Sequence, residues 1–260
     1  MKIESQVPVN TSCILKSGIP SFGVMALSGL LGGISLILFS VFLYTGLPGM
    51  IDLGFNEPAN LFIDALLCLL FFLQHSLMLR KWFRKWLSGF IPRDYLGAFF
   101  SIFSGIFLLI LMLFWQKSTA IQVDLNGVAY FLMCALFFLS IIGFYVTFRS
   151  LRPFDPLGIR EIVSHLKGKA VKKPLFTVRG AYRWVRHPFY FFSLLMIWTQ
   201  VSLTTDRFLF NGLWTVWIII GTFLEEKDLI ASFGDTYRKY QRNVPMLIPY
   251  RWKPWNQNTQ

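Results

Sequence analysis

Long apolar runs dominate the chain, and short polar or basic stretches separate them. A helix needs roughly 17–25 mostly apolar residues to cross a bilayer, and most of the runs are near that length. We place membrane helices at residues 22–46, 59–79, 95–115, 127–148, 189–203 and 207–224. The last two are short and are separated only by Thr204, Thr205 and Asp206, which indicates a tight helical hairpin. The pattern therefore predicts an all-α integral membrane protein with about six transmembrane helices.

Small residues recur at four-residue spacing in two of the predicted spans. Gly29 and Gly33 lie in the first span, and Gly97, Ser101 and Gly105 lie in the third. In lipid, this spacing lets two helix backbones approach closely. It predicts helix packing at these positions and carries no chemistry.

Two stretches outside the spans have helical periodicity. Residues 159–167 fit a short amphipathic helix. Residues 225–243 fit a longer one, and we expect it to lie at the cytoplasmic membrane surface or against the bundle. Its apolar stripe is formed by Leu229, Phe233, Tyr237, Tyr240 and Val244.

Composition supports the membrane assignment. Only 15% of the residues are charged, against about 25% in an average soluble domain. A net charge of +12 on a soluble protein would suggest nucleic acid, but here the basic residues flank apolar runs. Membrane lipid, and not nucleic acid, is therefore the expected partner.

The basic residues also predict orientation. Lys117 and Arg207 are the two that fall on one side, and the other 23 of the 25 Lys and Arg residues fall on the opposite side. By the positive-inside rule, both termini and the 149–188 loop lie in the cytoplasm, which in a bacterium means a multi-pass protein of the inner membrane. The start of the chain lacks the features of a cleaved signal peptide.

Several common kinds of site are not indicated. Cys13, Cys68 and Cys134 form no C-x-x-C pair, and no His, Cys or Glu set has the spacing of a metal site. The glycine-rich motifs of soluble nucleotide-binding folds are missing from the sequence as well.

Polar groups gather at the cytoplasmic ends of three predicted spans. Gln74-His75-Ser76 ends the second, His187-Pro188 begins the fifth, and Glu225-Glu226 ends the sixth. A helix start attracts anions, whereas acidic residues at a helix end oppose its dipole and need a cation, which can be Arg183, Arg186 or a ligand. The simpler alternative is a set of helix boundaries with solvated ion pairs and a packed histidine. Asp64, near the outer end of the second span, is expected to reach outward.

The C-terminal third resembles a known enzyme superfamily. Leu175 to Tyr190, with its Arg-His-Pro-Phe-Tyr ending, is similar to the cofactor segment of isoprenylcysteine carboxyl and phospholipid methyltransferases. Residues 225–245, with Glu-Glu-Lys-Asp-Leu and Phe-Gly-Asp-Thr-Tyr, resemble its C-terminal segment. Gln74-His75-Ser76-Leu77-Met78 is similar to the NnrU-like branch, which includes bacterial methanethiol S-methyltransferases.

The resemblance implies methyl transfer from S-adenosyl-L-methionine. Together with the predicted spans, it divides the chain into a cytoplasmic N-terminus (1–21), a four-helix membrane region (22–148) and a cofactor-binding region with the hairpin (149–260). His75 is the candidate catalytic base for a thiol. The implied cofactor-binding residues, with Glu226 added as the second member of the acidic pair, are Phe176, Thr177, Tyr182, His187, Pro188, Phe189, Tyr190, Glu225 and Glu226.

One departure from the superfamily bears on the methyl acceptor. Prenylcysteine enzymes carry a carboxylate-binding arginine about one turn before the glutamate pair, and this chain has Gly221 there. A small or lipophilic thiol such as methanethiol is therefore the preferred acceptor. The alternatives are a prenylcysteine carboxylate or phospholipid amine as acceptor, or a non-enzymatic NnrU-like accessory protein.

Overall fold

The computed structural model describes residues 20–46, 50–151, 155–168 and 176–256, and the predictions for residues 1–19 lie outside this range. Within it, five helical segments are long and apolar enough to cross a membrane, and α8 is a shorter apolar helix. The five are α1–η2–α2 (Ser21–Thr45), α3 (Glu57–Leu79), η3–α5 (Arg93–Phe114), α6 (Val128–Ser150) and α9 (Thr205–Phe233). The all-α membrane fold is confirmed.

The predicted hairpin differs in its lengths. The first arm, α8 (Pro188–Trp198), ends five residues earlier than expected, and α9 continues nine residues beyond the expected end at residue 224. Residues 199–204 are not helical, and Ser202–Thr204 form the short strand β2. Hydropathy alone could not locate these ends. In α9 the helical hydrogen bonding continues past the end of the apolar run, and in α8 it stops at Trp198, before the predicted span ends.

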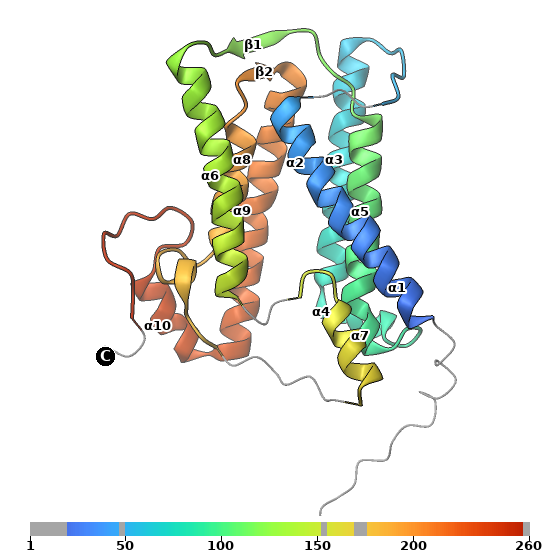
Figure 1. Cartoon of the computed structure of the whole chain (residues 1–260), viewed down its shortest axis with the longest axis vertical. Coiled ribbons are helices and arrows are strands. Elements are labelled where there is room, and N and C mark those ends of the chain that lie inside the picture. Colours follow the sequence, from blue (N-terminus) through green and yellow to red (C-terminus); the bar gives the residue numbers. More distant parts are fainter. Residues whose placement is uncertain (1–19, 47–49, 152–154, 169–175, 257–260) are drawn as a thin grey trace, which may run out of the picture.

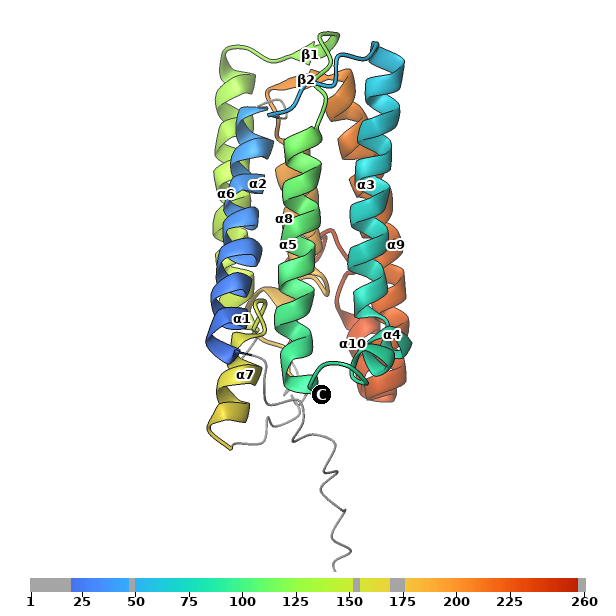
Figure 2. The same ribbon diagram turned by 90° about the vertical axis from the view of Figure 1, so that its right-hand side faces the viewer.

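The spans run side by side in one bundle (Figures 1 and 2). The first helical segment packs on α5, α5 on α3, α3 on α9, and α8 lies between α6 and α9. The antiparallel strands β1 (Ile121–Asp124) and β2 cover one end, which we call the strand end. The opposite end, which we call the basic end, carries α4 (Lys81–Leu87), α7 (Ile159–Leu166) and α10 (Asp235–Asn243).

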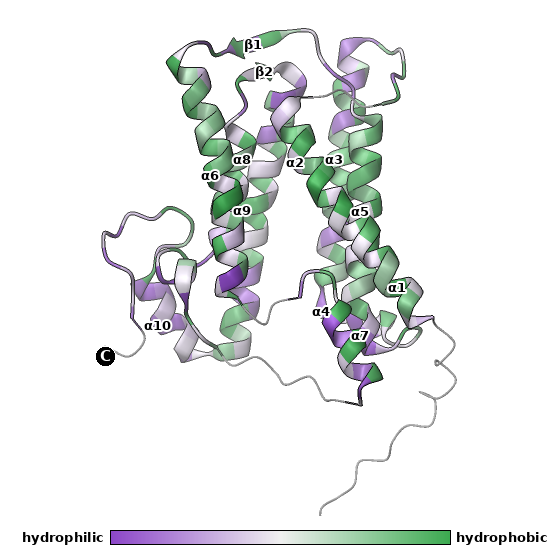
Figure 3. Cartoon of the chain, in the orientation of Figure 1, coloured by the Kyte–Doolittle hydropathy of each residue, from purple (hydrophilic) through white to green (hydrophobic). Residues whose placement is uncertain are grey.

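Apolar side chains cover the outside of the bundle as well as its core. Leu73, Phe131 and Ile37 are 66–71% exposed on the spans, and hydrophilic residues concentrate at the helix ends (Figure 3). In water such a surface would be costly, whereas lipid solvates it. The inner cluster is largely aromatic, with Phe39, Phe42 and Trp214 at its centre.

Two buried aspartates hold the strand end together. Asp206 at the start of α9 accepts hydrogen bonds from Trp115 Nε1 at 2.8 Å and from the backbone N–H of Ser118 at 3.1 Å. Asp64 is fully buried and accepts the backbone N–H of Gln116 at 2.9 Å. The expectation that Asp64 reaches outward is wrong, because it instead satisfies a backbone donor just beyond the end of α5.

The small-residue pattern is confirmed for α5 and wrong for the first span. A Cβ at Gly105 would lie 2.2 Å from the carbonyl oxygen of Leu31, and one at Gly32 would lie 2.0 Å from Ser101 Oγ. Gly29 and Gly33 have open space around them. The reason is the π-helical segment η2 (Ser28–Ile34), whose wider turn shifts which residues face a neighbour.

The C-terminal amphipathic helix is two helices. Residues 225–233 belong to α9, and Gly234, with a φ of 55°, separates them from α10. The predicted apolar stripe is confirmed, because Tyr237, Tyr240 and Val244 are buried against Phe176, Val178 and Trp255. The short helix predicted at 159–167 is confirmed as α7.

The glycine contacts give a test of the packing. Gly105→Ala forces a methyl group against the Leu31 carbonyl, and overpacking of this kind costs about 1–3 kcal/mol. We expect a lower melting temperature in detergent. Gly33→Ala is the matched control, because its added methyl group meets nothing within 4 Å. Equal melting temperatures for the two variants would contradict the packing described for η2 and α5.

Candidate active site

The candidate site lies at the basic end, where α8 begins and α9 approaches its end. Pro188 is the first residue of α8, a position at which its missing N–H costs nothing. The preceding two residues are held by the C-terminal segment: Arg186 N–H donates to the carbonyl of Pro245 at 2.8 Å, and His187 N–H donates to that of Met246 at 3.1 Å. The start of α8 is therefore pinned to the chain that follows α10.

Glu226 is the most heavily bonded side chain of the site. Arg186 binds it with two nitrogens, at 2.7 and 3.1 Å, and His187 Nε2 lies 2.8 Å from Oε1. Tyr237 donates its hydroxyl at 2.9 Å, and Gln241 donates its amide. Four side chains from two segments, the residues before α8 and the helix α10, thus surround one carboxylate whose side chain is only 8% exposed.

Glu225, its neighbour, is arranged differently. Its side chain is 45% exposed, and its Oε2 lies 3.6 Å from His187 Nδ1, longer than a normal hydrogen bond. It also interacts with the hydroxyl of Tyr190, whose ring stacks on His187 at a centroid distance of 5.5 Å. Glu225 therefore keeps acceptor capacity toward an outside group, whereas the acceptors of Glu226 are occupied by protein donors.

The charges of the two glutamates extend to their neighbours. Burial alone would lower the pKa of His187, but the hydrogen bond to Glu226 and the negative charges of both glutamates outweigh it and raise the pKa. Burial, followed by the charge of Glu225, raises the pKa of Tyr182. The site thus holds His187 toward its cationic form between two acids and keeps Tyr182 a neutral phenol.

The remaining predicted cofactor residues divide into two groups. Tyr182 joins the site through its backbone carbonyl, which accepts the Tyr240 hydroxyl at 2.6 Å. Phe176 packs on Phe233, Tyr237 and Tyr240, next to the glutamates, and Thr177 is exposed beside it. Phe189 instead faces α6, where its ring lies 6.1 Å from that of Phe144. The structure therefore brings Tyr182, His187, Tyr190 and the glutamates together and leaves Phe189 apart.

His75 lies elsewhere on the bundle. Its ring sits among those of Phe71, Phe100 and Trp217, and its Nδ1 is 3.3 Å from Ser104 Oγ. Trp217 precedes Glu225 by two turns of α9, or about 12 Å along the axis. Between them Gly221 occupies the same helix stripe, and a Cβ there would meet nothing within 4 Å. Open space therefore lies beside Gly221, between Trp217, which contacts His75, and Glu225 along α9.

Sequence reasoning missed two partners of Glu226. Gln241 carries no signal in the sequence, because its amide becomes relevant only once α10 folds back over α9. The apolar stripe predicts only the packing of the Tyr237 ring, which is observed, whereas its hydroxyl also donates to Glu226. Arg186 was anticipated as a possible cation for the acidic pair, and Arg183 instead bonds the carbonyl of Trp255 at 2.8 Å.

Comparison with known proteins extends the likeness beyond this site. The chain is 33% identical over 222 residues to methanethiol S-methyltransferase 1 of Bradyrhizobium diazoefficiens, which covers 83% of this chain and 77% of that protein. It is 35% identical over 200 residues to the methanethiol S-methyltransferase of a Pseudomonas strain, covering 76% of each. The chain belongs to the methanethiol S-methyltransferase family.

The family assignment confirms the predicted resemblance. Rat nurim is a more distant relative, at 26% identity over 195 residues, covering 70% of this chain and 73% of that protein. This likeness fits the wider isoprenylcysteine methyltransferase superfamily. Neither a family model nor a solved structure matches the chain.

The different environments of the two glutamates give a test. Glu226→Gln removes a buried charge from between Arg186 and His187, and breaking a buried ion pair costs about 3–5 kcal/mol. We expect a large drop in melting temperature, measured by tryptophan fluorescence in detergent. Glu225→Gln is the matched control and should lower stability by less than about 1 kcal/mol, because its side chain is half exposed. A similar loss in both variants would remove the distinction between the two residues.

Proposed function

We propose that the protein is an S-adenosyl-L-methionine-dependent membrane methyltransferase that methylates a small thiol, with methanethiol as the preferred acceptor. The observation that carries the proposal is the family membership. It is supported by a site in which protein donors occupy the carboxylate of Glu226, while that of Glu225 can accept hydrogen bonds from a ligand. The relatives at 30% identity or more that the comparison gives are named methanethiol S-methyltransferases, which favours an enzyme over the accessory-protein alternative.

The residues of the site fit the proposed cofactor. Glu225 offers a half-exposed carboxylate that suits an ammonium group or a ribose hydroxyl. The aromatic faces of Tyr182 and Tyr190 suit adenine and a positively charged sulfur. His187, held toward its cationic form, and the start of α8 suit the cofactor carboxylate. When bound, S-adenosyl-L-methionine supplies an electrophilic methyl group. The protein then needs to bind the cofactor, orient the thiol toward it and remove the thiol proton.

For the acceptor, we propose that the open space at Gly221 receives the thiol and that His75 accepts its proton. When bound, the cofactor would supply the methyl group to the thiol sulfur, while Gly221 would leave room for the thiol and His75 would take up its proton. The proton passes from the thiol to the imidazole and then to solvent. Gly221 carries no charge and adds no volume, which favours a small neutral acceptor over a carboxylate.

Orientation completes the proposal. Lys117 and Arg207 lie at the strand end, and the other described Lys and Arg residues lie toward the basic end, so we propose that the basic end faces the cytoplasm. The thiol site then faces the compartment in which the cofactor is made. A cysteine introduced at Asp124 should react with an impermeant reagent from outside, whereas one at Lys253 should not; the reverse pattern would overturn the orientation.

The activity itself is tested with a thiol panel. Purified protein in detergent is incubated with methyl-radiolabelled S-adenosyl-L-methionine and methanethiol, longer alkanethiols, a prenylcysteine or phosphatidylethanolamine. We expect label in the thioethers, highest for methanethiol, and none in carboxyl methyl esters or methylated amines. Label in an ester or amine alone would overturn the thiol assignment.

Cofactor affinity tests the site. His187→Ala and Glu225→Ala each remove a charged partner, and losing a charge-assisted hydrogen bond costs about 1.5–3 kcal/mol, or roughly 10- to 150-fold in Kd. Calorimetry or radioligand binding should measure this loss. Lys227→Ala, next to the pair and exposed, is the control and should stay near wild type. Unchanged cofactor affinity in both site variants would mean that His187 and Glu225 serve only as helix-boundary residues and do not bind the cofactor.

Turnover tests His75 separately. A positioned base contributes about 10²–10⁴-fold, so His75→Ala should lower kcat strongly and leave cofactor affinity unchanged. Because only the thiolate attacks well, raising the pH should restore part of the rate. Phe103→Ala, on the exposed face of α5, controls for loss of apolar volume in the membrane. Full turnover of the His75 variant at neutral pH would make His75 a packing residue.

A further inference from the structure

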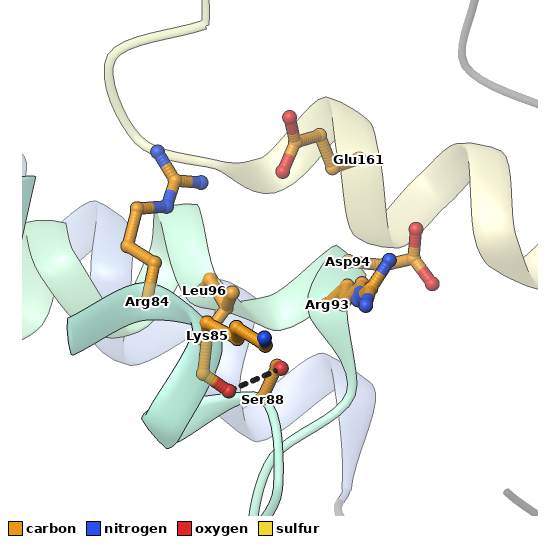
Figure 4. A pocket seen from close by; sticks show the side chains of 7 residues that line it. All are labelled: Arg84, Lys85, Ser88, Arg93, Asp94, Leu96 and Glu161. Carbon is orange, nitrogen blue, oxygen red and sulfur yellow. Dashed lines mark hydrogen bonds between the residues drawn. The ribbon is translucent and has the colours of Figure 1, made fainter. Parts of the chain in front are cut away.

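A polar cavity lies at the basic end, formed by elements that do not contribute to the candidate active site. It occupies about 380 Å³ between α4, the 3₁₀ turn η3 (Arg93–Tyr95) and α7 (Figure 4). The lining residues are Arg84, Lys85, Ser88, Arg93, Asp94, Leu96 and Glu161. Neither the methyl donor nor the thiol requires this cavity.

The residues that line the cavity carry more positive than negative charge, with three basic side chains against two acidic ones. Within the described part of the chain, Arg84, Lys85 and Arg93 make no ion pair within 4 Å. Asp94 is already engaged by His165 Nδ1 at 2.8 Å. Glu161 points toward Arg84 from α7 and is the one lining acid without an ion pair among these residues (Figure 4). Three cations around a hole of this size suit an anion.

Exposed aromatic side chains place the cavity at the membrane interface. Trp82, Trp86 and Phe90 are 64%, 56% and 66% exposed, and the rings of the last two lie 5.1 Å apart. Tryptophan favours the level of the lipid headgroups, and α4 begins two residues after α3 ends. A short basic helix with exposed tryptophans therefore lies along the interface, with Arg84 and Lys85 at headgroup depth.

We propose that this cavity binds the headgroup of an anionic phospholipid of the phosphatidylglycerol type. Arg84, Lys85 and Arg93 bind the phosphate, since guanidinium and ammonium groups form strong charge-assisted bonds to phosphate oxygens. Glu161 accepts hydrogen bonds from the glycerol hydroxyls, a role that a choline headgroup, which has no hydrogen-bond donor, does not satisfy. The acyl chains then pass along Trp86 and Phe90 into the bilayer.

The test uses the full-length protein in detergent, titrated with short-chain phosphatidylglycerol or phosphatidylcholine and followed by native mass spectrometry. Each basic residue near a headgroup contributes roughly five-fold in affinity, so Arg84→Gln/Arg93→Gln should weaken phosphatidylglycerol binding about 25-fold. The control Lys239→Gln/Lys253→Gln removes the same charge from exposed positions and should change it less than about two-fold. Phosphatidylcholine should bind weakly to all forms.

Two outcomes would overturn the proposal. One is an equal loss in both double variants, which would mean that surface charge alone attracts the lipid. The other is equal affinity of the wild-type protein for the two lipids. Melting temperature in lipid-free detergent reports folding, and Arg84→Lys/Arg93→Lys provides a variant that keeps the charge. Its phosphatidylglycerol affinity should stay within about five-fold of wild type, because the positive charges are kept.

Discussion

The basic end of the molecule depends on one buried carboxylate. Glu226 lies on a helix that spans the membrane, yet it is surrounded by Arg186, His187, Tyr237 and Gln241. In surroundings of low dielectric, an ion is tolerated only when such partners satisfy its charge and hydrogen bonds. The need to satisfy Glu226 draws the start of α8 and the whole of α10 onto α9. The positions of Glu225, Tyr190 and Tyr182 follow from this arrangement.

The strand end uses the same principle with different residues. Asp206 and Asp64 accept backbone N–H groups from the segment that follows α5, and Trp115 adds its indole N–H. The guanidinium of Arg207 lies 3.9 Å from the ring centroid of Phe42, which gives a buried cation an aromatic face. Backbone that leaves a helix inside a membrane needs partners from the protein, and here acids supply them. The strand end is thereby closed.

Between the two ends, α9 changes its role along its length. Its early turns pack Phe210 and Trp214 into the aromatic core, and Trp217 then bonds Ser76 and faces His75. Gly221 leaves space, and Glu225 and Glu226 follow one turn later. One helix therefore connects the core, the proposed acceptor space and the proposed cofactor site. This continuity explains why the α9 helix extends well past its apolar run.

The sequence by itself determined the class of protein, the approximate place of the apolar helices, and the concentration of polar groups at one end. These properties depend on local hydropathy and on charges next to apolar runs, which need no knowledge of neighbours in space. The helix start at His187-Pro188 and the acidic pair at Glu225-Glu226 could also be predicted from the sequence, because helix starts and charged pairs have local sequence signals. Only the tertiary structure decided which glutamate has its acceptors occupied by protein donors and which can accept from a ligand. The adjacent residues Glu225 and Glu226 are chemically identical and differ only in the side chains that surround them. It also decided that Gly32 faces α5 in place of Gly29 or Gly33, and that α10 turns away at Gly234. In each case the reason is the same: the outcome depends on contacts between segments far apart in the chain, and residue spacing along one helix does not contain them.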